Sequence, residues 1–351
     1  MLNYEVNHPD EEAMREAAAR WDAVAKPLRS LGRLEDLVTR IAGIQRTADV
    51  RVAPRCALVF CADHGVVEEG VSQSGQEVTS LVARSIAAGT ANVNLMAGAV
   101  RADVFAVDMG MARDIDCPGL IRRRIAPGTR NMTRGPAMTR EEAGRAVQAG
   151  IDLVGEMRAR GYRLIATGEM GIGNTTASTA LCCALLGARP EAVTGRGAGL
   201  SDEGLSRKKQ AVRRALEVNG PDAKDPLGTL AKVGGFEIAA MAGAFLGGMA
   251  FGVPVVMDGV ISAVAALLAA RLCPAARGYM LPSHMSRERA AALVMNELAA
   301  EPVIHADMAL GEGTGAVALL PMLDMALRVY AGPHTFEELG MEAYVPQEEA
   351  T

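Results

Sequence analysis

Short apolar runs with strand character recur along this chain, and segments with helical patterns separate them. The runs are Ala57–Cys61, Val104–Val107, Leu164–Ala166, Val253–Met257 and, with a weaker signal, Gly278–Leu281. Strands that alternate with helices favour β-α-β units, right-handed crossovers and a parallel sheet. The sequence therefore predicts an α/β fold, with a ligand bound beyond the carboxyl ends of the strands.

Four of these runs lead into an acidic residue that glycine follows closely: Asp63, Asp108, Glu169 and Asp258. A single acid would indicate little, because Asp and Gly are ordinary turn residues. Four acids in one structural position instead favour a shared sheet edge, where we expect at least two of them to face the ligand. Turn formation and helix capping are the alternative roles.

The residues after the third run predict a phosphate site. Gly168–Gly173 have the composition of a tight turn, and Asn174, Thr175 and Thr176 then open an alanine-rich helix. Such a turn directs free backbone N–H groups and the positive end of a helix at one point. The pattern is not the dinucleotide fingerprint, and it lacks the lysine of a P-loop. A helix cap from Asn174 or Thr175 is the alternative, and both roles are compatible.

Two glutamates are candidates for chemistry. Glu169 lies beside the predicted phosphate site, where a second anion is unfavourable, so we expect it to meet a ribose hydroxyl or a developing cation. In Leu310–Ala316, Glu312 lies between Gly311 and Gly313, and no neighbouring side chain keeps it from a substrate. A partly apolar pocket would raise its pKa and make it a better general base near neutral pH. An exposed acid on a flexible loop is the alternative.

Other candidates carry weaker signals. A glycine-rich loop contains Gly195 and Gly197, and Lys208 follows it; a phosphate partner and a solvated helix face explain this lysine equally well. His64 and His284 follow predicted strands but lack the close partners of a zinc helix, so no metal is predicted. Three consecutive arginines, residues 122–124, are predicted to be surface charge.

Composition excludes some classes of protein. The net charge is −5, whereas nucleic-acid-binding proteins concentrate Lys and Arg. The six cysteines have no Cys-x-x-Cys spacing and lie mostly in apolar runs, which indicates small buried side chains in a reducing compartment. Residues 1–14 are polar and acidic, unlike a signal peptide. We therefore expect a cytoplasmic protein without a nucleic-acid partner.

One stretch is long enough to span a membrane. Ile238–Met257 has no charged residue over 20 positions. However, Gly252 and Pro254 interrupt it, Asp258 follows at once, and a second apolar run, Ile261–Ala270, comes next. We expect a buried helix, a strand and another buried helix, and no membrane span.

Both ends of the chain have helical patterns. They cover Pro9–Trp21, Pro27–Arg40 as a turn followed by a helix, Arg287–Ala300 and Pro321–Val329. An acidic tail follows at Thr335–Thr351. These segments are expected to pair as a small helical unit.

Together the motifs resemble the nicotinate-nucleotide–dimethylbenzimidazole phosphoribosyltransferases of cobalamin lower-ligand synthesis. The matching segments are residues 168–176 and 310–316, with 26–27, 30–35, 62–66, 128–131 and 194–197, in the family's order. The resemblance implies a Rossmann-like parallel sheet flanked by helices, and a homodimer. It implies a large domain at 31–289 and a small helical domain, from 1–30 plus 290–351, that contributes the Glu312 loop.

The resemblance also implies a reaction and its residues. Phosphoribosyl would pass from nicotinate mononucleotide to 5,6-dimethylbenzimidazole or a related base, with inversion at the anomeric carbon and Glu312 as the general base. The pyridinium leaving group is already activated, so no metal or other cofactor is expected. Nucleotide-binding positions would be Glu169, Gly171, Gly173, Asn174, Thr175, Thr176, Gly195, Gly197, Lys208, Asp258 and Ser283. Base-binding positions would be Gln76, Met170, Leu310, Gly311 and Gly313.

Two positions depart from the family pattern. Arg29 stands where the family commonly has glycine, and Arg84 lies near the base-pocket segment where a neutral polar residue is less surprising. A purine or phenolic acceptor is therefore one alternative. A phosphoribosyltransferase that uses diphosphate-activated ribose and Mg²⁺ is another, although Val255–Gly259 offers only one of the usual paired acids. A non-catalytic nucleotide sensor on the same fold is the third.

Overall fold

The computed structural model describes residues 4–332 and 334–344, and six parallel strands form one sheet at its centre. The strands are β1 (Arg55–Ala62), β2 (Asp103–Gly110), β3 (Ile121–Arg122), β4 (Leu164–Met170), β5 (Val255–Met257) and β6 (Met280–Pro282). Their order is β3-β2-β1-β4-β5-β6, so the chain runs outward from β1 and then returns to its other side. The predicted α/β class and all five predicted strands are confirmed. Strand β3 was missed because two residues are too few for a periodic pattern.

Strand β1 lies in the middle of the sheet and shows how the sequence sets the two faces. All eight of its residues are buried. Leu58 and Phe60 point into one hydrophobic core, while Val59 and Cys61 point into the other, as the two-residue period of a strand requires. A parallel strand buried on both faces therefore has a continuous apolar sequence.

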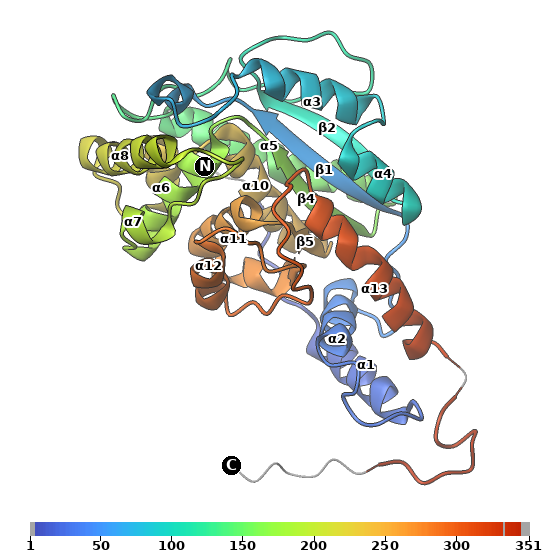
Figure 1. The fold of residues 1–351 in the computed structure, drawn as a ribbon. Coiled ribbons are helices and arrows are strands. Elements are labelled where there is room, and N and C mark those ends of the chain that lie inside the picture. Colours follow the sequence, from blue (N-terminus) through green and yellow to red (C-terminus); the bar gives the residue numbers. More distant parts are fainter. Residues whose placement is uncertain (1–3, 333, 345–351) are drawn as a thin grey trace.

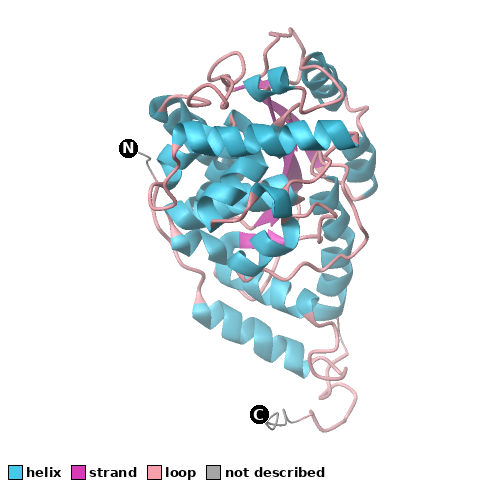
Figure 2. Ribbon diagram, turned by 60° about the vertical axis from the view of Figure 1, so that its left-hand side comes forward, coloured by secondary structure: helices cyan, strands magenta, loops and turns pink. Residues whose placement is uncertain are grey.

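Helices cover both faces, and Figure 2 shows the strands enclosed between them. One core is shared by α5 (Arg140–Ala159), α6 (Asn174–Leu186), α7 (Pro190–Val193), α8 (Asp202–Asn219), α9 (Pro226–Val233), α10 (Phe236–Phe251), α11 (Val260–Leu272) and α12 (Ala291–Leu298). The other is shared by α1 (Glu11–Ala23), α2 (Arg33–Gln45), α3 (Glu77–Ala87), α4 (Asn92–Ala99) and α13 (Thr314–Tyr330). Two 3-10 helices, Gly65–Glu69 and Pro274–Tyr279, connect these elements.

The long uncharged stretch forms α10, β5 and α11, as predicted. Helix α10 packs against α5 through glycines: a methyl group on Gly150 would overlap the carbonyl oxygen of Ala240, and one on Gly243 would overlap that of Val147. Close contact with a neighbouring helix therefore buries the apolar surface. Among residues 4–332 and 334–344, no helix is long and apolar enough to cross a bilayer.

The two ends of the chain meet beside α1 and α2. Val24 forms a backbone bridge with Thr335, and the amide of Phe336 donates to the carbonyl of Ala23 at 3.1 Å. Helix α13 packs on β4, β5 and α2, and Figure 1 shows it running from the sheet toward α1 and α2. The division into 31–289 and 1–30 plus 290–351 stays a prediction. Residues 345–351 of the acidic tail lie outside the described residues.

Two predicted helices differ in extent from the observed ones. The helix expected over Arg287–Ala300 begins only at Ala291, because the amide of Arg287 donates to the carbonyl of Met308 at 3.2 Å. The helix expected over Pro321–Val329 is longer, because α13 already begins at Thr314 and includes Pro321.

Candidate active site

A pocket of about 260 Å³ opens beyond the carboxyl ends of β4 and β5. Ten residues predicted for the site line it: Glu169, Met170, Gly171, Asn174, Thr175, Gly197, Asp258, Leu310, Gly311 and Glu312. The remaining predicted residues are not in the lining: Gln76, Gly173, Thr176, Gly195, Lys208, Ser283 and Gly313. Segments that are far apart in the sequence thus meet at the sheet edge where the ligand was expected.

The four acids that follow strands have different tasks. Glu169 and Asp258 line the pocket. Asp63 instead accepts a hydrogen bond from Thr79 Oγ1 at 2.6 Å, and Asp108 accepts from the amides of Gly110 and Met111. Two acids therefore face the pocket, Asp108 stabilises the turn after β2, and Asp63 ties the end of β1 to α3 and to the segment after β2.

The predicted phosphate turn joins β4 to α6. Gly173 has a φ of +98° and is the residue before α6, whose first turn receives no side-chain cap. The side chain of Asn174 instead donates to Glu169, and Thr175 Oγ1 accepts from Lys208 Nζ at 2.8 Å. The alternative role of Asn174 or Thr175 as a cap is not observed, and the positive end of α6 faces the pocket wall.

Lys208 supplies a cation at this helix end. It lies on α8 with only 1% of its surface exposed. Burial lowers its pKa to about 8, and the nearby Glu288 partly opposes this shift. A methyl group on Gly197 would lie 3.3 Å from Lys208 Nζ, so glycine keeps the approach open. A buried lysine next to a helix N-terminus is well suited to an anionic ligand.

Glu169 is the single acidic residue of β4 and is almost fully buried. Burial is the main cause that raises the pKa of its carboxyl to about 8, and the negative charges of Asp258 and Glu237 add to it. The hydrogen bond from Asn174 lowers the pKa in part. Glu169 therefore carries a proton at neutral pH in this state, and a cation in the pocket would favour its ionised form.

The Glu312 loop is held by Asp258. The carboxylate of Asp258 accepts from the amides of Gly313 at 3.2 Å, Gly315 at 2.8 Å and Ala316 at 3.0 Å. It thus satisfies free N–H groups at the start of α13 and compensates the positive end of that helix. Asp258 was predicted to contact nucleotide; in this structure both of its oxygens anchor the loop.

Glu312 lies in the left-handed region, with a φ of +60°, between glycines at +89° and +87°. Burial raises its pKa, and the charge of Asp258 adds to the shift, while a bond of 3.4 Å from the amide of Val93 opposes it. The loop lies directly on β4, because a methyl group on Gly168 would be 2.6 Å from the carbonyl oxygen of Glu312. The backbone thus places a carboxylate of raised proton affinity in the pocket.

The lining residues that were not predicted for the site include three polar side chains after β6: His284, Ser286 and Glu288. They follow β6, the strand with the weakest sequence signal. The expectation that site residues follow the strands, which found Glu169 and Asp258, therefore applied to this segment as well. The ring of His284 fills the space beside Gly315, where a methyl group would overlap it. Burial lowers its pKa. Ser283, predicted for nucleotide, donates to the carbonyl of Met257 at 2.5 Å.

The predicted base-binding residues are spread around the pocket. Leu310 is 53% exposed at its rim, and Met170 is half-buried in its wall. Gln76 donates to the carbonyl of His64 at 3.0 Å. Its helix, α3, reaches the phosphate turn through Thr79, whose hydroxyl accepts from the amide of Ile172 at 3.1 Å.

The two departures from the family pattern lie outside the lining. Arg84 is exposed on α3, and Arg29 is exposed with a φ of +55°. That left-handed conformation explains why glycine suits the position of Arg29. Within the described chain, no group of three or more His, Cys, Asp or Glu side chains is arranged to hold a metal ion.

Comparisons with known proteins point to one family. A family model described as "Phosphoribosyltransferase" matches residues 6–341. Nicotinate-nucleotide–dimethylbenzimidazole phosphoribosyltransferase from Acetivibrio thermocellus is 44% identical over 96% of each chain, and that from Desulforudis audaxviator is 46% identical over 95% of this chain and 94% of its own. The crystal structure of CobT from Thermus thermophilus aligns with a TM-score of 0.90 and 43% identity over 95% of this chain and all of its own.

Proposed function

We propose a reaction for this chain, which belongs to the nicotinate-nucleotide–dimethylbenzimidazole phosphoribosyltransferase family and is a phosphoribosyltransferase. It transfers phosphoribosyl from nicotinate mononucleotide to 5,6-dimethylbenzimidazole or a related base. The products are α-ribazole 5′-phosphate and nicotinate. The observation that carries this proposal is one pocket lined on one side by Thr175 at the start of α6, to which the buried Lys208 donates, and on the other by Glu312.

In the proposed complex, the phosphate lies near the start of α6. Lys208, which donates to Thr175, and the positive end of the α6 dipole neutralise its charge. Met170 and Leu310 pack against the flat acceptor base. Glu169 lies beside the ribose, where its ionised form stabilises positive charge at the anomeric carbon.

The transfer step forms one C–N bond and breaks another. A ring nitrogen of the acceptor attacks the anomeric carbon from the face opposite nicotinate, which inverts the configuration from β to α. The electron pair of the broken bond returns to the pyridinium nitrogen. Glu312 takes the proton from the acceptor's second ring nitrogen, and its raised pKa favours this role near neutral pH.

The family relation supports three further proposals: a homodimer, a cytoplasmic location, and the two domains at 31–289 and at 1–30 plus 290–351. Purines and phenols are the alternative acceptors, and an incubation with each of them in place of the benzimidazole tests them.

The test is an incubation with nicotinate mononucleotide and 5,6-dimethylbenzimidazole in chelator-treated buffer, followed by mass spectrometry. We expect ribazole phosphate and free nicotinate from the wild type, and loss of both in Glu312→Gln. Glu203→Gln is the matched control, because Glu203 is exposed on α8. Full turnover by Glu312→Gln would refute the general-base role. Tight binding of nicotinate mononucleotide without turnover of any acceptor would favour the sensor.

A further inference from the structure

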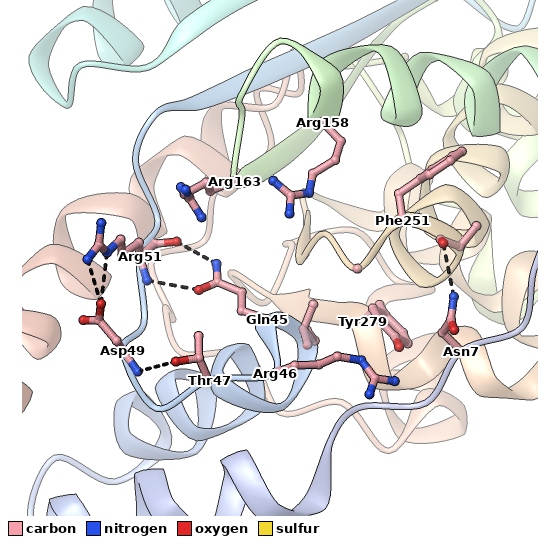
Figure 3. A pocket seen from close by; sticks show the side chains of 13 residues that line it. Asn7, Gln45, Arg46, Thr47, Asp49, Arg51, Arg158, Arg163, Phe251 and Tyr279 are labelled. Carbon is pink, nitrogen blue, oxygen red and sulfur yellow. Dashed lines mark hydrogen bonds and ion pairs between the residues drawn. The ribbon is translucent and has the colours of Figure 1, made fainter.

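A second pocket, of about 490 Å³, lies at the opposite edge of the sheet, where the strands begin. Figure 3 shows its arginine-rich wall. Arg46 follows α2, Arg158 lies in the last turn of α5, and Arg51 and Arg163 precede β1 and β4. Among the described lining residues, Asp49 is the one acid. Positive charge therefore collects here, although the chain as a whole has a net charge of −5.

Two of these arginines have no counter-ion in the part of the chain that the structure describes. Arg51 pairs with Asp49 at 2.7 Å, and Arg46 lies 3.6 Å from Asp10. Within residues 4–332 and 334–344, no carboxylate lies within 4.0 Å of Arg158 or Arg163. In Figure 3 both side chains lie along the same side of the pocket, above Gln45. Neighbouring guanidinium groups without counter-ions repel each other and attract an anion.

A third and larger pocket, of about 860 Å³, provides the contrast. It also has arginines in its lining, but each of them is paired. Arg130 contacts Glu142, Arg134 contacts Glu68 and Arg140 contacts Asp225, all at 3.0 Å or less. The arginines of that pocket are neutralised by carboxylates of the protein itself, whereas Arg158 and Arg163 find none among the described residues.

We propose that the pocket of Arg158 and Arg163 binds a chain of two or more phosphates, carried by a nucleotide or present as free polyphosphate. Planar guanidinium groups bind phosphate oxygens through paired hydrogen bonds. Several guanidiniums around one cavity suit more than one phosphate, and the volume lies within the range of small-ligand pockets. Phe251, 43% exposed in the lining, supplies apolar aromatic surface for the base of a nucleotide.

The location of the arginines also suggests a simpler role. Arg158 and Arg46 lie at the carboxyl ends of α5 and α2, where a cation stabilises the helix dipole. That role explains neither Arg163 nor the open cavity. It predicts that the arginines contribute to stability and that no phosphate compound binds.

The test is titration calorimetry with ATP and with tripolyphosphate at low salt, on the full chain. We expect dissociation constants of about 1 mM or tighter that weaken as salt rises. Arg158→Ala and Arg163→Ala should each weaken binding at least about tenfold. Arg145→Ala is the matched control, because Arg145 is exposed on the same helix, α5. Lys208→Met, which alters the first pocket, should leave this binding unchanged.

The two probes separate the two sources of phosphate. Tighter binding of ATP, with the difference lost in Phe251→Ala, assigns the site to nucleotides; equal binding assigns it to free polyphosphate. The proposal is overturned if neither probe binds, or if Arg158→Ala and Arg163→Ala lower the melting temperature but leave binding unchanged. It is also overturned if Lys208→Met abolishes binding, because the ligand would then occupy the first pocket.

Discussion

Replacing Asp258 with Asn tests how the loop that bears Glu312 is held. One carboxylate oxygen of Asp258 accepts from the amides of Gly315 and Ala316, and the other accepts from the amide of Gly313. The asparagine carbonyl can keep the first two bonds. Its NH₂ group would then face the N–H of Gly313, so that one hydrogen bond is lost together with the negative charge at the start of α13.

The magnitude follows from these contacts. A buried N–H left without a partner costs about 1–3 kcal/mol, and loss of a charge at a partly buried helix end costs up to about 2 kcal/mol. The removal of repulsion between Asp258 and the carboxyls of Glu169 and Glu312 offsets part of this loss. We expect the free energy of unfolding to fall by about 1–3 kcal/mol. The pKa values of Glu169 and Glu312 should both decrease, because the charge of Asp258 raises them.

Urea unfolding at pH 7 measures the stability, and the pH dependence of turnover measures the shift in the carboxyls. Asp152→Asn is the control, because Asp152 is exposed on α5; it should change neither quantity. The acid limb of the pH profile should move to lower pH in Asp258→Asn alone. Stability within about 0.5 kcal/mol of the wild type would refute the anchoring role. Lost stability with an unmoved acid limb would refute the electrostatic coupling.

Three further predictions concern the site and its surroundings. The pKa of Glu169 is raised to about 8 in the folded protein, so its carboxyl there keeps a proton that it loses at lower pH in the unfolded chain. Wild-type stability should therefore fall between about pH 5 and 8, by at most about 1.4 kcal/mol per pH unit; equal slopes for wild type and Glu169→Gln in urea unfolding would contradict this. Lys208→Met should raise the melting temperature, because burial disfavours the lysine charge, and should raise the KM for nicotinate mononucleotide about tenfold or more; an unchanged KM would exclude a phosphate contact. Arg29→Gly should raise the free energy of unfolding by about 0.5 kcal/mol, because relief of the strained left-handed conformation exceeds the entropy cost of glycine. A lower melting temperature in thermal unfolding would instead indicate a stabilising contact of Arg29.

The sequence predicted local features well because their signals are local. Apolar runs identified five strands. The turn predicted at Gly168–Gly173 located the start of α6 at Asn174, although β4 continues to Met170 and leaves only residues 171–173 in the connection. The glycines around Glu312 were recognisable because they flank it directly. The pattern failed where an element was too short, as in β3, or where a distant backbone contact delayed the start of a helix, as the bond from Arg287 to Met308 does before α12.

The sequence by itself determined the class of fold, the sheet edge at which the pocket opens, and the two glutamates in its lining, because strand, turn and glycine signals are each encoded within a few neighbouring residues. Only the tertiary structure decided that Asp258 anchors α13, that Lys208 reaches Thr175, and that Arg158 and Arg163 share one pocket with no counter-ion among the described residues. These contacts join residues that are far apart in the sequence. They depend on strand order and on the packing of whole helices, which no local pattern encodes. The pKa shifts depend on the same packing, because burial and neighbouring charges cause them.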